Sequence, residues 1–592
     1  MSSTDAGHLR RGLAAIAQTP PWLRAAIRAD ETALVVVAAV IGVAAGLATV
    51  AMSAVTQLCH EILFAIPHGQ RLSAQAAVAP WRSVVVPLLG GLAVGVLGLA
   101  VARWWPRPAV DPIEANALYG GRMSLNDSLV VVAQTLLSNG VGASVGLEAG
   151  YTQIGSAMAS RLGRLLRVRR ADLRLLVGCG SAAAIAAAFN TPLAGAFYAF
   201  ELVIGTYTLV ALTPVIAATV GAVLVARVLQ GGDEELRIGL GAVVEVSDYP
   251  AVLVLGVVCA FVGIGIMRGV TLTEALFRQS RVRPWLRPAA GGLVVGVLAL
   301  ATPQVLSSGH GALALGLDAH YGVATIATIL VLKSVASAVS IGSGFRGGLF
   351  FASLFLGSLV GKLFSAGLLG LGFVHAPSAT VFAMVGMCAL AAAVVGGPLT
   401  MGFIALESTG SLPMTAAVLA AVVVSSMTVR RSFGYSFTTW RFHLRGEVIR
   451  SAVDVGWIRN LTVGRMMRRN MRTVRADTPI LAFRRDYPLG ASTRVIVVDG
   501  VGRYAGMAMV AEAHASETAV LLQDVLHQQG VVLLPQMTVK EAAAAFEAAE
   551  ADALAVVDGV ESLGVIGLLT EYYALRRYSE ELDRQRRDLS GE

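Results

Sequence analysis

Charged residues are scarce in this chain. Only 14% of its 592 residues are Asp, Glu, Lys or Arg, whereas 55% are hydrophobic. Soluble domains average about 25% charged residues, so the composition excludes an ordinary soluble protein. Several apolar runs are long enough to cross about 30 Å of hydrocarbon. The longest examples are 33–57, 83–102, 208–229, 250–268 and 321–341. The composition therefore predicts a protein that crosses the cell membrane several times.

Cysteine is scarce too, and no metal-type spacing occurs. The four cysteines lie in or beside apolar runs, so we predict packing residues and neither a metal nor a cofactor. They are Cys59, Cys179, Cys259 and Cys388. A serine nucleophile needs a base within reach, and no histidine falls inside a spanning run. An intramembrane hydrolase that uses Ser144 is therefore disfavoured, and we predict that the protein is not an enzyme.

A cleavable leader and a nucleic-acid surface are also missing. Residues 1–30 have no short apolar core with a cleavage site, so we predict a polar cytoplasmic segment there. The formal charge is +8, and arginine clusters such as Arg161 to Arg174 flank the apolar runs. Such clusters are typical of cytoplasmic anchors. A nucleic-acid site needs basic charge with interleaved aromatic residues on one soluble face, which this chain lacks.

The main functional signal is the stretch 139–155. It combines five glycines with one acid, Glu148, among long apolar runs. A carboxylate at membrane depth is costly, which makes it a functional candidate by default. The glycines let the chain bend into a helix start, whose unpaired amides at Gly146 and Leu147 suit an anion. Glu148 would then occupy the place of the anion and compete with it. Alternatively, it pairs with an arginine and only holds helices together.

The membrane body repeats itself. Gly146-Leu147-Glu148 is echoed by Gly348-Leu349-Phe350, and Gly155 is echoed by Gly357. The second copy has no acid, and its amides at Leu349 and Phe350 are candidate anion donors. Repeats of about 31–230 and 245–430 predict a site at their interface. Two opposed helix starts would attract an anion there without a full positive charge.

A second echo follows each of these stretches. Phe189-Asn190-Thr191-Pro192-Leu193 precedes Glu201, and Val395-Gly396-Gly397-Pro398-Leu399 precedes Glu407, with the same interval from Pro to Glu. We interpret these two acids as structural ion-pair members rather than as proton relays.

These motifs resemble those of the CLC chloride channel and transporter family. Gly146 to Gly155, Phe189 to Gly195 and Gly347 to Ala352 are similar to three family motifs, and the resemblance covers about 31–445. It implies an all-α membrane domain, built as an inverted repeat of tilted and broken helices. It also implies a homodimer in which each subunit has its own anion pathway. Glu148 takes the role of a gating glutamate, which blocks the pathway when ionised and swings away when protonated.

The chain departs from the family at the side chains that bind the anion. Ala109 stands where the family has an anion-contacting serine, and its anion-binding tyrosine falls near Thr438, with Tyr435 as a substitute. Leu202 stands where the antiporters place their inner proton-transfer glutamate. The family's first motif falls on Pro108 to Pro112, the segment that contains Ala109. Three polar residues in and just after this segment are interpreted as solvated loop residues, with a reshaped inner vestibule as the alternative: Asp111, Glu114 and Asn116.

The resemblance implies transmembrane transport of chloride or a similar anion, with protons as a second substrate. We predict proton-coupled exchange, and the alternative is a passive voltage- or pH-gated anion channel. Chloride, fluoride, nitrate and bicarbonate all stay open, with fluoride the least favoured. A cation transporter is disfavoured, because cation sites need several inward acids or carbonyl-rich breaks.

From about 450 the apolar runs shorten and charged residues increase. Residues 460–580 predict two α/β copies, of which the first includes Val463 to Met467 and the second includes a helix from Val539 to Glu550. They resemble a pair of CBS domains, which implies a cytoplasmic domain. Adenosine-binding members have Ser/Thr-x-x-Asp after the last strand. Here Thr570 is present, but Tyr573 stands at the position of the Asp. A structural or dimerising role is therefore favoured over nucleotide binding. Residues 581–592 form a charged tail.

Overall fold

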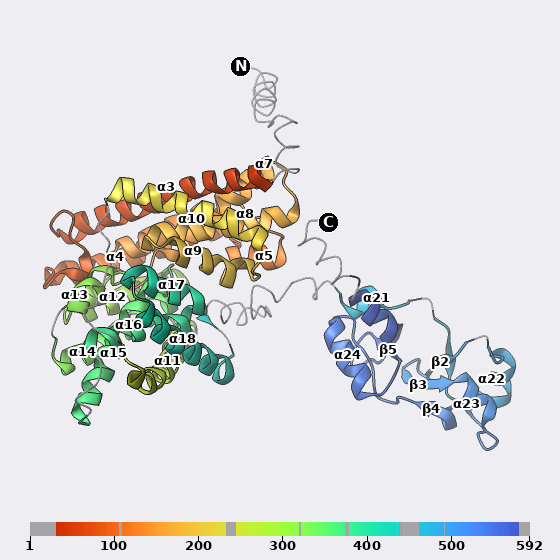
Figure 1. The fold of residues 1–592 in the computed structure, drawn as a ribbon. Coiled ribbons are helices and arrows are strands. Elements are labelled where there is room, and N and C mark those ends of the chain that lie inside the picture. The colour runs from red at the N-terminus through yellow and green to blue at the C-terminus, as the bar shows by residue number, and fades with distance from the viewer. Residues whose placement is uncertain are drawn as a thin grey trace. The chain divides into compact units, whose positions relative to one another are not determined.

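The structure is a computed structural model of the whole chain (Figure 1). It describes residues 31–105, 109–231, 244–318, 321–372, 378–434, 436–437, 440, 461–469, 471–490, 492–578 and 580. The chain divides into two compact units, Met1–Asp454 and Val455–Glu592, and each is described by itself. The predicted polar N-terminal segment, 1–30, and the charged tail, 581–592, lie outside the described residues.

In the described residues of the first unit, every regular element is a helix. Its first half contains α3 (Glu31–Phe64), α4 (Pro80–Trp104), α5 (Pro112–Leu118), α6 (Leu125–Gly140), α7 (Glu148–Leu165), α8 (Arg170–Phe189), α9 (Pro192–Tyr198), the π-helical η2 (Ala199–Ile204) and α10 (Leu209–Gln230). Its second half contains α11 (Tyr249–Gln279), α12 (Arg287–Ala299), α13 (His310–Asp318), α14 (Val323–Ser343), α15 (Phe350–Gly370), α16 (Ala379–Val395), α17 (Pro398–Thr409) and α18 (Leu412–Ser432). Eight helices of the described chain are long and apolar enough to cross a membrane. The predicted all-α, multi-pass architecture is confirmed.

The two halves meet through matching elements. Helix α4 packs on α12, and α9 packs on α17, so each of these elements contacts its own counterpart. A Cβ on Gly91 would lie 2.2 Å from the Pro288 carbonyl oxygen, and one on Gly292 would lie 2.0 Å from that of Pro87. Contacts that are reciprocal in this way lie on a two-fold axis that relates the halves.

Glycines also set the helix spacing within each half. A Cβ on Gly155 of α7 would lie 2.3 Å from the Gly180 carbonyl oxygen of α8. A Cβ on Gly357 of α15 would lie 2.3 Å from the Gly386 carbonyl oxygen of α16. Small residues let helix backbones approach closely in membranes. The repeated glycines of the sequence therefore mark the same close helix contact in both halves.

Each half contains a glutamate that accepts hydrogen bonds from backbone amides of the other half. Glu407 of α17 accepts hydrogen bonds from the amides of Leu193 and Ala194, both at 2.9 Å, at the start of α9. Glu201 of η2 accepts from the amides of Leu399 at 2.8 Å and Thr400 at 2.9 Å, at the start of α17. The structural role is as expected: the hydrogen-bond partners are helix-start amides, and Arg430 and Arg227 interact electrostatically with Glu201 and Glu407, respectively. A carboxylate at a helix N-terminus satisfies amides that have no acceptor within the helix.

The second unit is α/β. Its strands are β1 (Thr473–Arg475), β2 (Arg494–Val498), β3 (Tyr504–Met509), β4 (Leu526–His527), β5 (Ala553–Val557) and β6 (Val565–Thr570), and its helices are α21 (Val463–Met466), α22 (Ile480–Asp486), α23 (Val510–Ala515) and α24 (Val539–Ala548). One sheet has the order β1-β2-β3-β4, in which only β1 and β2 run parallel, and the other pairs β5 with β6 antiparallel. Two α/β copies are as expected for a CBS pair.

One segment of this unit belongs to the copy opposite from the one predicted. The amide of Val463 donates to the Met537 carbonyl oxygen at 2.9 Å, and Arg468 forms a β-bridge with Leu568. Val463 also packs in one apolar core with Phe546. The segment before β1 therefore completes the second copy rather than the first, because its apolar side chains fit the core beneath α24.

Candidate anion site

Two glycine-rich turns meet at the centre of the first unit. The amide of Gly146 donates to the Gly348 carbonyl oxygen at 2.8 Å, and the amide of Gly348 donates to that of Gly146 at 3.1 Å. This pair is an antiparallel β-bridge, as expected of segments related by a two-fold axis. The amide of Ser144 also donates to the Ser340 hydroxyl at 3.0 Å, and that of Arg346 donates to the Ser138 hydroxyl at 3.0 Å. The bridge places the starts of α7 and α15 beside each other.

Glu148 is the first residue of α7 and is only 5% exposed. Its Oε1 accepts a hydrogen bond from the amide of Phe351 at 3.1 Å. Its Oε2 is buried and has no hydrogen-bond partner among the described residues. The carboxylate of one half therefore lies at the N-terminus of a helix from the other half. Since no described arginine is hydrogen-bonded to it, the alternative of a structural pair with arginine is not favoured.

The amides of the site differ from the prediction at two positions. The Gly146 amide is held by the bridge to Gly348, so it is unavailable to an anion in this conformation. The donor to Glu148 is Phe351, which the sequence reasoning missed because it counted from the wrong residue of the helix start. Leu147 and Leu349 occupy the N-cap positions of α7 and α15. The amides of Leu147, Leu349 and Phe350 stay predicted donors.

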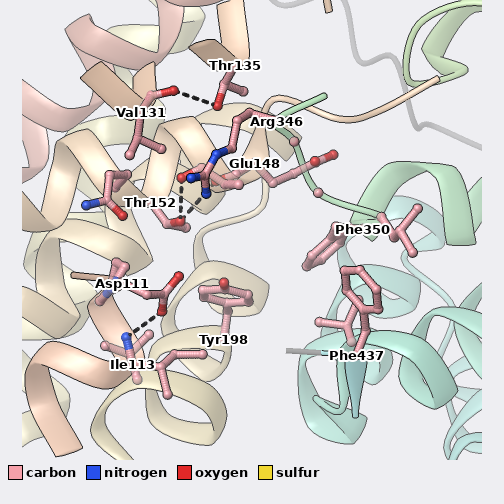
Figure 2. Close-up of a pocket in the computed structure, with 18 of the residues that line it drawn as sticks. Asp111, Ile113, Val131, Thr135, Glu148, Thr152, Tyr198, Arg346, Phe350 and Phe437 are labelled. Atoms are coloured by element: carbon pink, nitrogen blue, oxygen red, sulfur yellow. Dashed lines mark hydrogen bonds between the residues drawn. The ribbon is translucent and has the colours of Figure 1, made fainter. Parts of the chain in front are cut away.

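A cavity of about 170 Å³ opens beside Glu148 (Figure 2). Both halves contribute to its wall, since Tyr198 faces Phe350 across it, and Arg346 of the second half lines it together with Glu148 of the first. Ala109, Asp111 and Phe437 also line it. Tyr198 was not predicted; its only signal is its place at the end of the short helix that begins at Pro192. Thr438 and Tyr435, the candidates for the anion-binding tyrosine position, lie outside the described residues.

The segment that begins at Ala109 is not a solvated loop. Asp111 lines the cavity and caps α5, since its carboxylate accepts from the Ile113 amide at 2.9 Å. Glu114 is 8% exposed and Asn116 is 2% exposed. The Asn116 side-chain amide donates to the carbonyl oxygens of Arg174 and Val203. The solvated-loop interpretation is therefore wrong, because α5 lies in the protein interior and both side chains are enclosed by its neighbours.

Other chemistries find no support in this region. Ser144 is fully buried, and its hydroxyl pairs with that of Ser337 at 3.0 Å rather than with a base. In the described parts of the chain, no group of three or more His, Cys, Asp or Glu residues is arranged to hold a metal ion.

Comparisons with known proteins identify the family of the chain. The sequence model of the voltage gated chloride channel family matches residues 108–430. A putative chloride channel protein, ClcB-like, of Ralstonia nicotianae is 34% identical over 409 residues, which cover 67% of this chain and 93% of that protein. The voltage-gated ClC-type chloride channel ClcB of Escherichia coli O9:H4 is 30% identical over 399 residues, with 67% and 95% covered.

Two solved structures share the fold. A slow cyanobacterial Cl⁻/H⁺ antiporter superposes with a TM-score of 0.61 at 21% identity, covering 70% of this chain and 97% of that one. A eukaryotic CLC transporter superposes with a TM-score of 0.57 at 17% identity, covering 93% of this chain and 98% of that one. With its helix architecture, its family motifs and these relatives, the chain belongs to the voltage gated chloride channel family, known as CLC.

Proposed function

We propose that the protein transports chloride or a similar anion across the membrane, and that Glu148 gates the pathway. The observation that carries the proposal is the hydrogen bond of 3.1 Å from the Phe351 amide to the buried Glu148 carboxylate. A helix N-terminus attracts negative charge through its unpaired amides and its dipole. The carboxylate therefore occupies a place that suits a dissolved anion.

The gate works by competition between two anions for one set of donors. An ionised Glu148 is held at the start of α15 and excludes the transported anion. Protonation removes the negative charge, so the helix start no longer prefers the side chain over a dissolved anion. Amides hold an anion with partial charges only, which allows release as well as binding. Proton binding at Glu148 thereby becomes linked to anion passage.

We propose proton-coupled exchange as the mode of transport. Two structures with this fold are those of a slow cyanobacterial Cl⁻/H⁺ antiporter and a CLC-type fluoride/proton antiporter, the latter with a TM-score of 0.53. A passive anion channel is the second candidate, and Leu202 favours it. Its buried apolar side chain stands where the antiporters of the family carry an inner acid. We also propose that the protein is a homodimer, as the family resemblance implies.

The test replaces Glu148 by glutamine in protein reconstituted into liposomes. The Glu148→Gln change keeps the shape of the side chain and removes its charge and its proton. Chloride efflux should continue, whereas chloride-driven proton movement should fall at least tenfold and the dependence of efflux on pH should vanish. Parallel chloride and proton fluxes in the unchanged protein establish exchange; chloride flux without proton flux establishes the channel.

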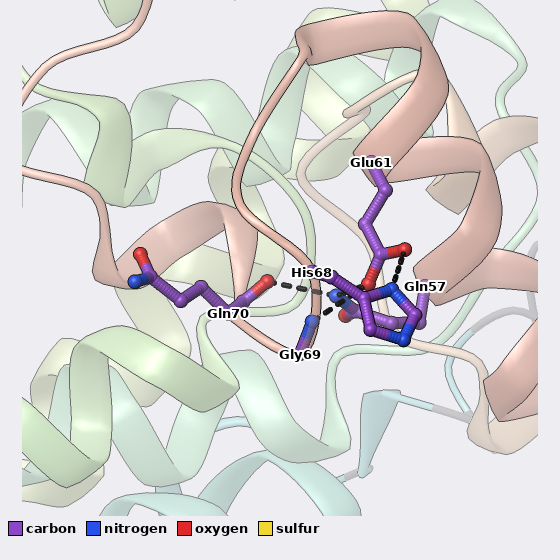
Figure 3. A network of polar contacts seen from close by, with 5 residues as sticks. All are labelled: Gln57, Glu61, His68, Gly69 and Gln70. Atoms are coloured by element: carbon purple, nitrogen blue, oxygen red, sulfur yellow. Dashed lines mark hydrogen bonds and ion pairs between the residues drawn. The ribbon is translucent and has the colours of Figure 1, made fainter.

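Glu61 provides the matched control (Figure 3). This glutamate near the end of α3 accepts hydrogen bonds from the Gln57 side chain at 2.9 Å, His68 Nδ1 at 2.7 Å and the Gly69 amide at 2.9 Å. Both of its oxygens have partners in α3 or in the loop that follows it, whereas Glu148 Oε2 has none among the described residues. Glu61→Gln should leave pH dependence and coupling unchanged. An unaltered pH profile in folded Glu148→Gln, or a reversal potential that follows the cation gradient, would refute the proposal.

A further inference from the structure

A second cavity lies apart from the anion site and has a different character. Its volume is about 420 Å³. Four of the lining residues are arginines, Arg122, Arg164, Arg167 and Arg170, and none of the described lining residues is acidic. The cavity lies between the connection from α5 to α6, the end of α7 and the start of α8. In the sequence, this cluster resembled only a cytoplasmic anchor; the structure shows that these exposed arginines line one cavity.

A turn of two glycines shapes one wall. Gly120 and Gly121 have φ values of +60° and +80°, a backbone conformation that side chains with a Cβ rarely adopt. A Cβ on Gly120 would lie 2.3 Å from Arg170 Nε, so the Arg170 side chain lies directly against this turn. A Cβ on Gly121 would lie 3.0 Å from the amide nitrogen of Arg174. The turn therefore packs on the first turns of α8 and positions the Arg170 guanidinium at the cavity.

The described lining of the cavity supplies four arginines and no acid. Arg164 donates to two carbonyl oxygens, those of Met123 at 2.8 Å and Ser160 at 3.3 Å, which orient its guanidinium without neutralising it. Asp172, the acid in the first turn of α8, interacts with Arg169, which does not line the cavity. Behind the wall, Arg174 Nε is buried without a hydrogen-bond partner among the described residues.

The start of α8 adds to this field. This helix has 20 residues; the side chain of its N-cap residue, Arg169, makes no capping hydrogen bond, and the Asp172 carboxylate accepts from the Arg169 amide. Its first amides have no acceptor within the helix and carry the positive end of the helix dipole. Arg170 and Leu173 line the cavity from this first turn. Side-chain charge and helix dipole therefore favour negative charge at the same place.

We propose that this cavity binds a phosphate-bearing anion. Guanidinium groups present paired donors that match phosphate oxygens, and several of them together select a polyanion over a single chloride. The volume also exceeds what a single halide ion fills. Helix α8 is a candidate membrane span that begins at Arg170, so the cavity adjoins the end of a span. Basic pockets at that depth bind lipid head groups, and a soluble phosphate offers the same chemistry.

The experiment uses the full chain and two probes. In detergent, inorganic pyrophosphate is titrated and its Kd is measured by calorimetry. In nanodiscs of phosphatidylcholine with phosphatidic acid, the lipid retained by the protein is counted by native mass spectrometry. The double variant Arg122→Gln/Arg170→Gln removes two cavity charges. The control Arg278→Gln/Arg281→Gln removes the same charge from the exposed end of α11 and the loop after it.

At least one probe should bind the unchanged protein and the control equally, and the cavity variant at least tenfold more weakly. Binding of pyrophosphate assigns a soluble ligand; binding of phosphatidic acid alone assigns a head group. Arg170→Lys, which keeps the charge but loses the paired donors, should give an intermediate loss and serves if the double variant does not fold. Absence of binding by both probes, or equal losses in cavity variant and control, overturns the proposal.

Discussion

The starts of α7 and α15 have the same backbone and different side chains. Their N-cap residues have similar torsion angles, φ −89° and ψ −8° at Leu147 and φ −107° and ψ 7° at Leu349. A glycine precedes each, and the two glycines hydrogen-bond to each other. The next residue is Glu148 in one half and Phe350 in the other. The repeat therefore supplies the same helix start twice, whereas the titratable group is supplied once.

The largest effect should come from forcing the two turns apart. A Cβ on Gly347 would lie 2.6 Å from Val145 Cβ and 2.7 Å from the Gly146 carbonyl oxygen, so Gly347→Ala must displace backbone. Overpacking of this kind costs about 1–3 kcal/mol. Chloride flux in liposomes should fall at least tenfold, and the melting temperature should fall as well.

Gly367→Ala, near the end of the helix α15 that follows this turn, is the matched control. A Cβ at Gly367 would meet nothing within 4 Å. Flux and melting temperature should therefore stay within error of the unchanged protein. If both alanine variants lose transport equally, close approach of the turns is not what the site requires.

The next largest effect should come from displacing the Glu148 carboxylate from its position at the start of α15. A Cβ on Gly146 would lie 1.9 Å from Glu148 Oε2, the mobile end of a side chain. Gly146→Ala should displace the carboxylate without unfolding the protein. Chloride flux should then lose its pH dependence, as expected for Glu148→Gln, although the acid is retained.

Gly348→Ala tests the same idea from the other half. The nearest atom to a Cβ there is Glu148 Oε2 at 3.1 Å, a contact that a small shift relieves. Its pH profile should move much less than that of Gly146→Ala. A pH profile that is unchanged in folded Gly146→Ala would show that the observed position of the carboxylate does not control the pathway.

A moderate effect on stability is expected from Glu201 and Glu407, which each bind helix-start amides of the other half. Glu201 Oε2 also accepts from the Thr400 hydroxyl at 2.6 Å, whereas Glu407 bonds only to amides among the described residues. Hydrogen bonds to charged groups contribute about 1.5–3 kcal/mol each. Glu201→Gln should therefore lower the melting temperature more than Glu407→Gln does. When both changes are made in a Thr400→Val protein, the two decreases in melting temperature should become nearly equal. Equal melting temperatures of the two single variants would show that the hydroxyl adds nothing.

The smallest effect should appear at a link between the two copies of the second unit. Arg494 of β2 forms a bidentate pair with Asp552, at 2.5 and 2.6 Å, and holds the pKa of Asp552 below its usual range. A lowered pKa stabilises the folded form above about pH 4, and this stability is lost as pH falls through the lowered value. The Asp552 side chain is 69% exposed, so solvent screening limits the gain to below about 1 kcal/mol.

Hydrogen exchange of β5 and β6 in the full chain measures this link. Asp552→Asn should speed exchange slightly at pH 6, and the difference should shrink as the pH falls below 4. Asp477→Asn is the control, because Asp477 pairs with Arg475 only two residues away, within one copy. Faster exchange of β5 in both variants would rule out a specific link between copies.

Sequence reasoning located what depends on local pattern. The repeat, the acid at a helix start and the glycines of the close helix contacts all follow from spacing. It failed where the partner is set by packing. The Gly146 amide, the Phe351 donor and the partners of Glu407 all depend on which segment of the other half lies opposite. The burial of Asn116 follows from the depth of α5, which its seven residues do not encode.

The contacts of Glu201 and Glu407 with the opposite halves have a consequence for folding during synthesis. During synthesis the first half enters the bilayer before Glu407 exists, so the amides of Leu193 and Ala194 lack their carboxylate acceptor. Glu201 likewise lacks its hydrogen-bond donors until the amides of Leu399 and Thr400 are synthesised. Unsatisfied backbone groups and an unpaired acid are expensive in hydrocarbon. An isolated first half should therefore be a substrate for quality-control proteases, and co-expression of the second half should rescue it.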